Sequence, residues 1–195
     1  MRMKRTLWMP ATVAALALAA APARAQLLPL AFEVRGGVTS PTGDFANGTK
    51  SGLGLTGTIE FRVLPLPVVY LYGGYGLDRF GSDDPNAPDV DYESRGYLVG
   101  GRVSAPTLFG ALPVVPWARV GATFSELKIS RRNVSLTSDR KTGLDVGLGI
   151  EFQAAPMVKV VPGATYRSYR PAFNNQQSTA RVTYWVFDVG VRVAL

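Results

Sequence analysis

The chain has 195 residues, among them 21 glycines but no cysteine and no histidine. Without cysteine it forms no disulfide or thiolate metal site, and without histidine it lacks the commonest general base and metal ligand. The formal charge of +7 would suit a nucleic-acid partner, but four of the basic residues lie in the first 25 positions. Without them the chain has 17 basic and 14 acidic residues, a net charge of +3, which is too mild to favour nucleic-acid binding.

The first 25 residues are predicted to be a cleaved signal peptide. Three basic residues precede an apolar stretch at 11–21, and Ala23 and Ala25 place small side chains at the positions that a signal peptidase requires. The alternative, an uncleaved anchor, would need about 20 apolar residues, more than two prolines leave here. We therefore predict cleavage before Gln26, which is not a lipidated cysteine, and a single mature domain at 26–195.

Eight segments of the mature chain are predicted as β-strands, because apolar residues alternate with polar or small residues. The alternation is clearest at 53–63, 144–152 and 187–195, while 68–78 is apolar on both faces, so that its facing stays open. Pro162 predicts a local irregularity in its strand. In chain order the predicted strands are 32–39, 53–63, 68–78, 96–103, 118–125, 144–152, 160–167 and 187–195.

The connections between these strands alternate in length, which is typical of a transmembrane β-barrel. Short turns at 64–67, 105–113 and 154–157 are predicted at one end. An even number of strands would place both termini at this end, which faces the periplasm in an outer membrane. The other end is predicted to carry the long polar loops, at 41–51, 79–94, 127–140 and 171–180.

Alternation alone does not separate a membrane barrel from a soluble, lipocalin-like periplasmic barrel with its apolar face inward. Three features favour the membrane. The polar face carries charges of both signs, such as Glu60 with Arg62 and Asp188 with Arg192, and it is rich in glycine. Aromatic residues also fall near strand ends, where an aromatic girdle would lie: Phe61, Phe152, Tyr166, Tyr184, Trp185 and Phe187.

The export signal, the opening strand that runs into 36–45 (GGVTSPTGDF) and the alternating last strand resemble the small outer-membrane β-barrel proteins of Gram-negative bacteria, such as the OmpA, OmpX and OmpW types. The resemblance implies an eight-stranded, antiparallel, up-and-down barrel. It also implies recognition of the last strand by the barrel assembly machinery. That strand usually ends in an aromatic residue in the family, whereas Leu195 ends it here.

An enzyme is not expected. Barrels of this kind that are enzymes resemble one another in depending on a catalytic histidine, which this sequence lacks. Asp145 and Glu151 lie on one strand face, but about 20 Å apart, too far to act as a catalytic pair. No cofactor is predicted.

The predicted inner face carries eleven charged residues. An eight-stranded interior is just wide enough for side chains, and buried charges must be paired, so we favour an ion-paired plug over a selectivity-setting lumen. The alternative, which the OmpW-type resemblance implies, is a narrow channel for small or apolar solutes. The residues are Glu33, Arg35, Glu60, Arg62, Arg102, Arg119, Asp145, Glu151, Arg167, Asp188 and Arg192.

Two of the long loops carry charge clusters. Six acidic residues between Asp78 and Glu93 could attract a hard cation, but they lack the order of an EF-hand, which favours a solvated loop. The loop 127–140 is basic, and guanidinium groups pair well with phosphate. Arg131 and Arg132 are therefore predicted to contact lipopolysaccharide phosphates, with a merely soluble loop as the alternative.

Taken together, the sequence predicts a monomeric, non-enzymatic outer-membrane barrel with a structural or surface-interaction role in the cell envelope. Its expected partners are outer-membrane lipid, lipopolysaccharide and the assembly machinery. The narrow channel and the soluble ligand-binding barrel remain the alternatives.

Overall fold

The computed structural model describes residues 30–195 apart from 64–65, 67, 86–87, 106–113, 133, 174–175 and 178–179. The predicted signal peptide, its cleavage site and most of the turns at 64–67 and 105–113 lie outside the described residues. Among the residues described, no helix is both long and apolar enough to cross a membrane.

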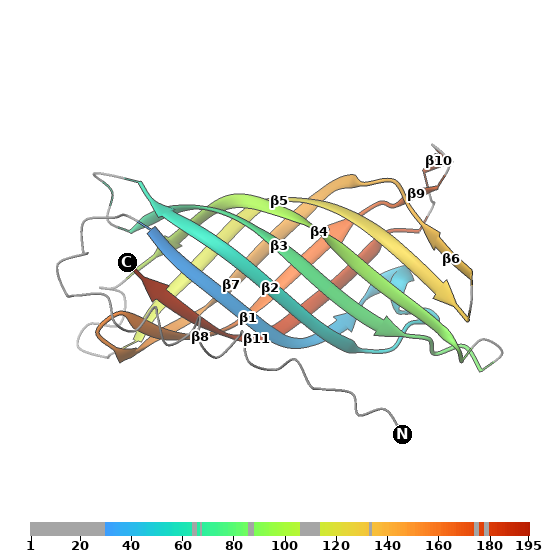
Figure 1. Ribbon diagram of the computed structural model, residues 1–195, viewed down its shortest axis with the longest axis horizontal. Coiled ribbons are helices and arrows are strands. Elements are labelled where there is room, and N and C mark those ends of the chain that lie inside the picture. The colour runs from blue at the N-terminus through green and yellow to red at the C-terminus, as the bar shows by residue number, and fades with distance from the viewer. Residues whose placement is uncertain are drawn as a thin grey trace, which may run out of the picture.

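Eight long strands form a closed antiparallel barrel (Figure 1). Strands that follow one another along the chain are paired, and the pairing of β1 with β11 closes the sheet. The predicted eight-stranded up-and-down barrel is confirmed. The long strands are β1 (Leu30–Pro41), β2 (Gly52–Arg62), β3 (Val69–Gly81), β4 (Val90–Ser104), β5 (Val114–Arg131), β7 (Lys141–Ala155), β8 (Val158–Tyr169) and β11 (Val182–Ala194).

The connections separate the barrel into two ends. At the end that we name the turn end, β7 and β8 are joined by two residues only, and the two ends of the described chain meet, with the Leu195 amide donating to the Leu30 carbonyl at 2.9 Å. The opposite end, the loop end, carries a turn of 3-10 helix, η1 (Gly43–Ala46), and the short strands β6 (Val134–Thr137), β9 (Ala172–Phe173) and β10 (Gln176–Gln177).

Three of the segments predicted as loops are partly strand, since the loop 171–180 contains the short strands β9 and β10. β4 already begins at Val90, inside the predicted loop 79–94, and β5 continues to Arg131 and forms a hairpin with β6. Backbone hydrogen bonds hold a sheet together without a hydrophobic face, so strand pairing can continue where the apolar alternation stops. The change from apolar to polar residues therefore does not mark the ends of these strands.

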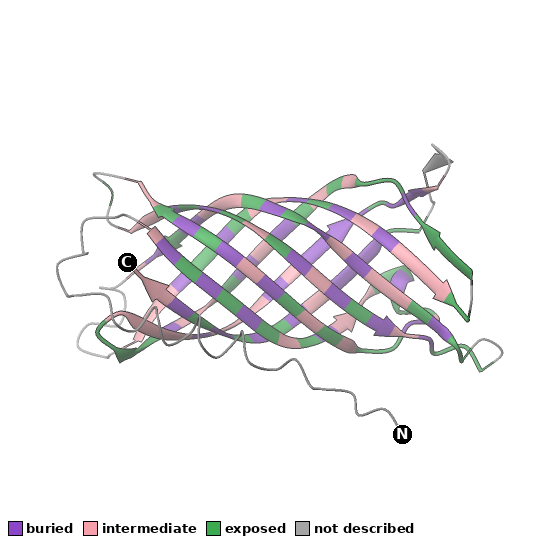
Figure 2. Cartoon of the chain, viewed as in Figure 1, coloured by how far each residue is buried: buried purple, intermediate pink, exposed green. Residues whose placement is uncertain are grey.

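The side chains alternate between the interior and the exterior along the strands (Figure 2). On β2, Leu53 is 71% exposed while Thr56 is 3% exposed. The strand whose facing the sequence left open, β3, places Tyr70 and Tyr72 inside and Leu71 outside. Polar and small residues thus fill the interior, and most apolar residues face out.

The irregularity predicted at Pro162 is present in the ladder between β7 and β8. The two strands pair at Gly149 with Gly163 and again at Phe152 with Val160, and the ladder skips the residues between. Proline has no amide hydrogen to donate, which accounts for the gap.

Candidate functional site

Each of the eight long strands contributes charged side chains to the barrel interior. Of the eleven predicted interior residues, ten are buried and Arg62, near the turn end, is half-buried. Together with the buried Asp78, these ten form two groups of ion pairs along the barrel, which we name the Arg102 cluster and the Arg167 cluster. The Arg102 cluster consists of Glu33, Arg35, Glu60, Arg102, Glu151, Asp188 and Arg192, and the Arg167 cluster of Asp78, Arg119, Asp145 and Arg167.

The Arg102 cluster lies toward the turn end. Nη1 of Arg102 donates to Glu33 at 2.6 Å and to Glu60 at 2.8 Å, and Nη2 donates to Glu151. Arg192 pairs with Glu60 at 2.8 Å. Three carboxylates from β1, β2 and β7 thus converge on one guanidinium from β4, which ties strands on different sides of the barrel together.

A buried tryptophan supports this cluster from within. The guanidinium carbons of Arg102 and Arg35 lie 4.5 and 4.6 Å from the centre of the Trp117 ring, a distance typical of cation–π contacts. The Trp117 indole N–H donates to the Ile150 carbonyl at 3.3 Å, and Arg35 also pairs with Glu33 and Asp188. The ring therefore fills the space between the arginines and fixes their positions.

The Arg167 cluster lies deeper in the barrel. Arg167 bridges Asp78 at 2.6 Å and Asp145 at 3.0 Å, and Arg119 pairs with Asp145 at 3.1 Å. Two tyrosine hydroxyls also donate hydrogen bonds to these carboxylates. Tyr72 donates to Asp145 at 2.9 Å and Tyr184 to Asp78 at 2.7 Å. These buried carboxylates thus have cations and neutral donors around them, as buried charge requires.

Sequence reasoning missed one member of these clusters and several residues that contact them. Asp78 was assigned to the acidic loop, and Tyr72 was left open, because the facing of β3 was unclear. Lys159, which pairs with Glu151 at 2.6 Å, and the buried Trp117 each lie one residue outside the segments predicted as strands. Continuing the alternation outward from Val160 and Ala118 by one position places both inside.

A third, apolar layer fills the interior at the loop end. We name it the aromatic cap. Phe80 lies edge to face against Tyr184 at 5.0 Å and against Phe45 of η1 at 5.2 Å. The first long loop therefore folds back over the interior. The cap consists of Phe45, Phe80, Leu127, Tyr169, Val182, Tyr184 and Val186.

Tyr184 corrects the predicted aromatic girdle, because its side chain is 1% exposed and belongs to the cap. Its neighbours in the chain, Trp185 and Phe187, face outward and stack at 6.3 Å, and strand alternation then turns Tyr184 inward. The other predicted girdle residues, Phe61, Phe152 and Tyr166, lie on the outer face.

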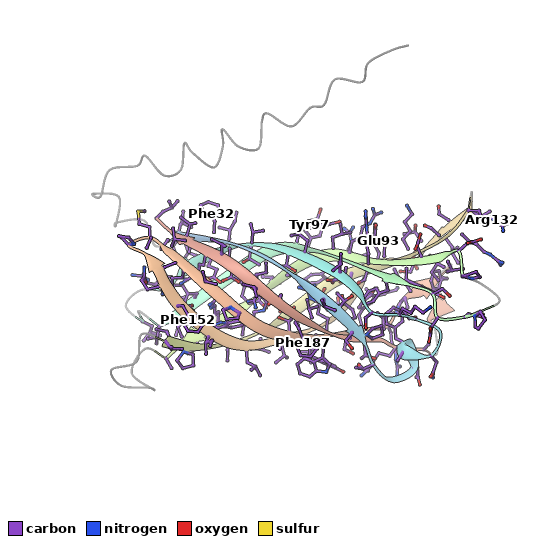
Figure 3. All side chains as sticks on the ribbon, turned by 90° about the horizontal axis from the view of Figure 1, so that it is seen from below. Phe32, Glu93, Tyr97, Arg132, Phe152 and Phe187 are labelled. Carbon is purple, nitrogen blue, oxygen red and sulfur yellow. The ribbon has the colours of Figure 1, made fainter. Side chains whose placement is uncertain are left out.

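The outer face carries an apolar belt that covers only part of the barrel's length. Figure 3 shows Phe32 and Phe152 near the turn end, Tyr97 and Phe187 near mid-length, and Glu93 and Arg132 beyond them. On β5 the outward residues are apolar from Val114 to Phe124, a span of about 25 Å along the axis of a barrel with tilted strands, which matches the height of an outer-membrane belt. The barrel thus projects beyond the belt at its loop end.

Ion pairs cover the outer face directly beyond the belt on β3, β4 and β5. Arg79 pairs with Glu93 at 3.2 Å, and Arg95 pairs with Glu126 at 2.7 Å. Glu126 also pairs with Arg140 at 3.1 Å. Arginines and glutamates alternate in this ladder, so its charges are largely neutralised within the protein.

The two charged loops do not form compact clusters. Of the six acidic residues between Asp78 and Glu93, Asp78 points into the interior, while Asp83 and Asp89 form exposed ion pairs with Lys50 and Arg132 at 3.3 Å. Among the described residues no group of three or more acidic side chains could hold a metal ion. Arg131 ends β5, and Arg132 follows with a positive φ of 48°.

Comparison with known proteins places the chain in a family. Residues 11–192 match the model of the outer membrane protein beta-barrel domain. The chain belongs to this family of outer-membrane barrels. No curated protein matches the sequence at a significant level.

Solved structures of outer-membrane proteins share the fold of this barrel. Neisserial surface protein A is similar with a TM-score of 0.67 and 15% identity over 86% of this chain and 97% of that chain. The outer-membrane protein OprG of Pseudomonas aeruginosa is similar with a TM-score of 0.52 and 11% identity over 86% of this chain and 98% of that chain. At these identities the likeness concerns the fold.

The family and the facing of the side chains decide between the two barrels that the sequence left open. The outer-membrane barrel exposes large apolar side chains such as Val34, Leu53 and Leu148, each more than half exposed, while Glu33 and Arg35 are inside. A lipocalin-like barrel has the reverse arrangement. The soluble periplasmic alternative is therefore wrong.

Proposed function

We propose that this outer-membrane barrel is a non-conducting, non-enzymatic structural protein of the cell envelope that presents its loop end at the cell surface. The observation that carries the proposal is the filling of the interior in three successive layers. The Arg102 cluster, the Arg167 cluster and the aromatic cap follow one another from the turn end to the loop end.

This filling opposes the passage of ions and solutes. An ion that entered from the turn end would have to separate buried pairs such as Arg102–Glu60 and Arg167–Asp145, and breaking a buried pair costs several kcal/mol. A small apolar solute would have to cross two ionic layers before it reached the cap. The interior therefore favours the plug over the narrow channel.

Bilayer recording tests the plug directly. The refolded barrel, reconstituted in planar bilayers, is expected to give no stable conductance steps, while a trimeric porin reconstituted in parallel gives large ones. A heat-modifiability gel establishes that the sample is folded. Stable, ion-selective steps from the folded barrel, or uptake of a small apolar solute by proteoliposomes above the rate of empty liposomes, would contradict the proposal.

The proposed orientation places the turn end, where Leu30 and the last residues of β11 meet, in the periplasm. This arrangement agrees with a cleaved signal before Gln26 and with assembly through β11, which keeps a regular alternation although Leu195, which is not aromatic, follows it. We propose that the barrel is a monomer, because each of the eight long strands that the structure describes is paired on both sides, so that the barrel wall offers a second copy no unpaired strand.

The contact of Arg131 and Arg132 with lipopolysaccharide remains a prediction. Arg131 lies seven residues beyond Phe124, the last apolar outward residue of β5, which corresponds to about 18 Å beyond the belt along the barrel axis. From there the two arginines could reach phosphates on the core sugars but not those at the membrane boundary. Full-length lipopolysaccharide and its lipid A portion are thus expected to differ in their dependence on this pair.

A further inference from the structure

Two arginines stand side by side on the outer face just beyond the apolar belt. Tyr169 of β8 pairs with Val182 of β11, so the next residues beyond, Arg170 and Arg181, face each other across the end of the two strands. Both are exposed, and strand alternation turns both outward. Neither guanidinium has an ion-pair partner among the described residues.

This lack of partners distinguishes the pair from the other arginines at the same level. Arg79, Arg95 and Arg140 each pair with a glutamate at 2.7–3.2 Å. Two adjacent cations without a counter-charge repel each other, and an anion between them relieves the repulsion. The outer face at the ends of β8 and β11 therefore carries two positive charges that no described acidic side chain neutralises, and it favours binding of an anion.

A hollow on the outer surface adjoins the two arginines. Its volume is about 550 Å³, and Arg170, Arg181 and Ser168 line its polar side. Toward the belt the lining becomes apolar, with Leu144 and the ring of Tyr166, which contacts Trp185 at 5.3 Å between ring centres. The hollow thus crosses the boundary between polar surface and membrane.

A second hollow of about 550 Å³ continues along the same strands into the belt. Ala164 and Pro162 of β8 line it, together with the larger side chains of Leu148, Phe187 and Val189 of the neighbouring strands. Ala164 is the outward residue next to Tyr166 on β8, so the two hollows lie one after the other. The lining is almost wholly apolar and suits a hydrocarbon chain.

We propose that the outer face of β7, β8 and β11 binds one molecule of lipid A. A phosphate of the glycolipid lies between Arg170 and Arg181, and one acyl chain lies in the hollow over Ala164 and Pro162. Two guanidinium groups can donate several charge-assisted hydrogen bonds to one phosphate dianion, and lipid A carries its phosphates at the boundary where these arginines stand. The inference goes beyond the proposed function and rests only on its orientation.

Native mass spectrometry of the refolded barrel, titrated with bisphosphorylated lipid A, tests the phosphate contact. We expect one saturable lipid A per barrel, and a rise in Kd of about tenfold or more in R170Q/R181Q, the loss of about 1.4 kcal/mol of binding. The matched control R131Q/R132Q removes the same charge at the loop tip. Since lipid A has no core sugars, this control is expected to change Kd less than about twofold.

A second pair of variants tests the acyl-chain hollow without changing charge. A164F fills the hollow and is expected to raise Kd at least about fivefold, whereas G57F, on the opposite lipid-facing side, is expected to leave Kd within about twofold. Heat-modifiability establishes that each variant folds. The proposal is overturned if dephosphorylated lipid A or phosphatidylglycerol binds as tightly as lipid A, or if each variant behaves like its control. None of these results depends on whether the interior conducts.

Discussion

Replacing Arg102 by methionine is expected to lower the free energy of unfolding of the barrel by about 3–5 kcal/mol. The substitution keeps an unbranched side chain of similar reach but removes the charge on which Glu33, Glu60 and Glu151 converge. Each of the three carboxylates keeps at least one other cation, but four buried carboxylates then share three cations. A buried charge that is not fully compensated is costly. Urea unfolding of the barrel in lipid vesicles, followed by tryptophan fluorescence, measures the loss.

The matched control is the same substitution at Arg95, on the same strand. Arg95 is 37% exposed and pairs with Glu126 on the outer face, where water screens the interaction. R95M is therefore expected to cost less than about 1 kcal/mol. If R102M and R95M had equal free energies of unfolding, the interior ion pairs would contribute no more to stability than the surface pairs do.

A second substitution separates the missing charge from the lost volume. Glu33 forms ion pairs with Arg102 and Arg35. When Glu33 is neutralised, Arg35 still pairs with Asp188. E33Q in the R102M background removes one uncompensated carboxylate, and we expect it to restore about 1–2 kcal/mol. In the wild-type background the same change should destabilise. A cost of R102M that E33Q leaves unchanged would point to packing instead.

The strands and their facing could be predicted from the sequence because the barrel wall imposes a local rule. A residue between lipid and a crowded interior must alternate in polarity with its neighbours, as 53–63 does, and the observed β2 spans Gly52–Arg62. The rule fails on β3, where tyrosines occur on both faces: Tyr72 inside and Tyr75 outside. A tyrosine tolerates either side because it combines an apolar ring with a hydroxyl.

The partners inside the barrel could not be predicted in the same way. Arg102 meets Glu33 from 69 positions away and Glu60 from 42 positions away. Which of these side chains face each other across the interior depends on strand register and on the tilt of the closed sheet, and neither is encoded in any single strand. The two arginines beside the outer hollows were missed for the same reason, since Arg170 and Arg181, directly beyond the paired ends of β8 and β11, become neighbours only through strand pairing.

Substituting alanine for Gly163 is expected to destabilise the barrel by about 1–3 kcal/mol through overpacking. A Cβ at this inward position would lie 2.6 Å from the Trp117 ring, 2.6 Å from Arg35 and 2.8 Å from the Leu148 carbonyl oxygen. The backbone oxygen is fixed by the sheet, and the ring is held by Arg35 and Arg102 and by its hydrogen bond to the Ile150 carbonyl. None of these neighbours can move away without breaking another contact.

Gly57→Ala provides the control, because a Cβ at this lipid-facing position of β2 meets nothing within 4 Å. Both substitutions reduce the freedom of the unfolded chain equally, so the difference between them reports the folded state alone. We expect G57A to change the free energy of unfolding by less than about 0.5 kcal/mol. Equal effects of G163A and G57A in the same urea titration would mean that the packing around Trp117 is loose.

A double-mutant cycle with Trp117 identifies the ring as the cause. W117F shortens the side chain on the Gly163 side and by itself destabilises, since it removes the stacking surface of two arginines. In that background the alanine at position 163 has room, and G163A is expected to cost at least about 1 kcal/mol less than in the wild-type protein. Strictly additive losses would assign the clash to Arg35 or to the Leu148 carbonyl. A coupling of the expected sign would instead show that Trp117, between its two guanidinium groups, limits the space at position 163.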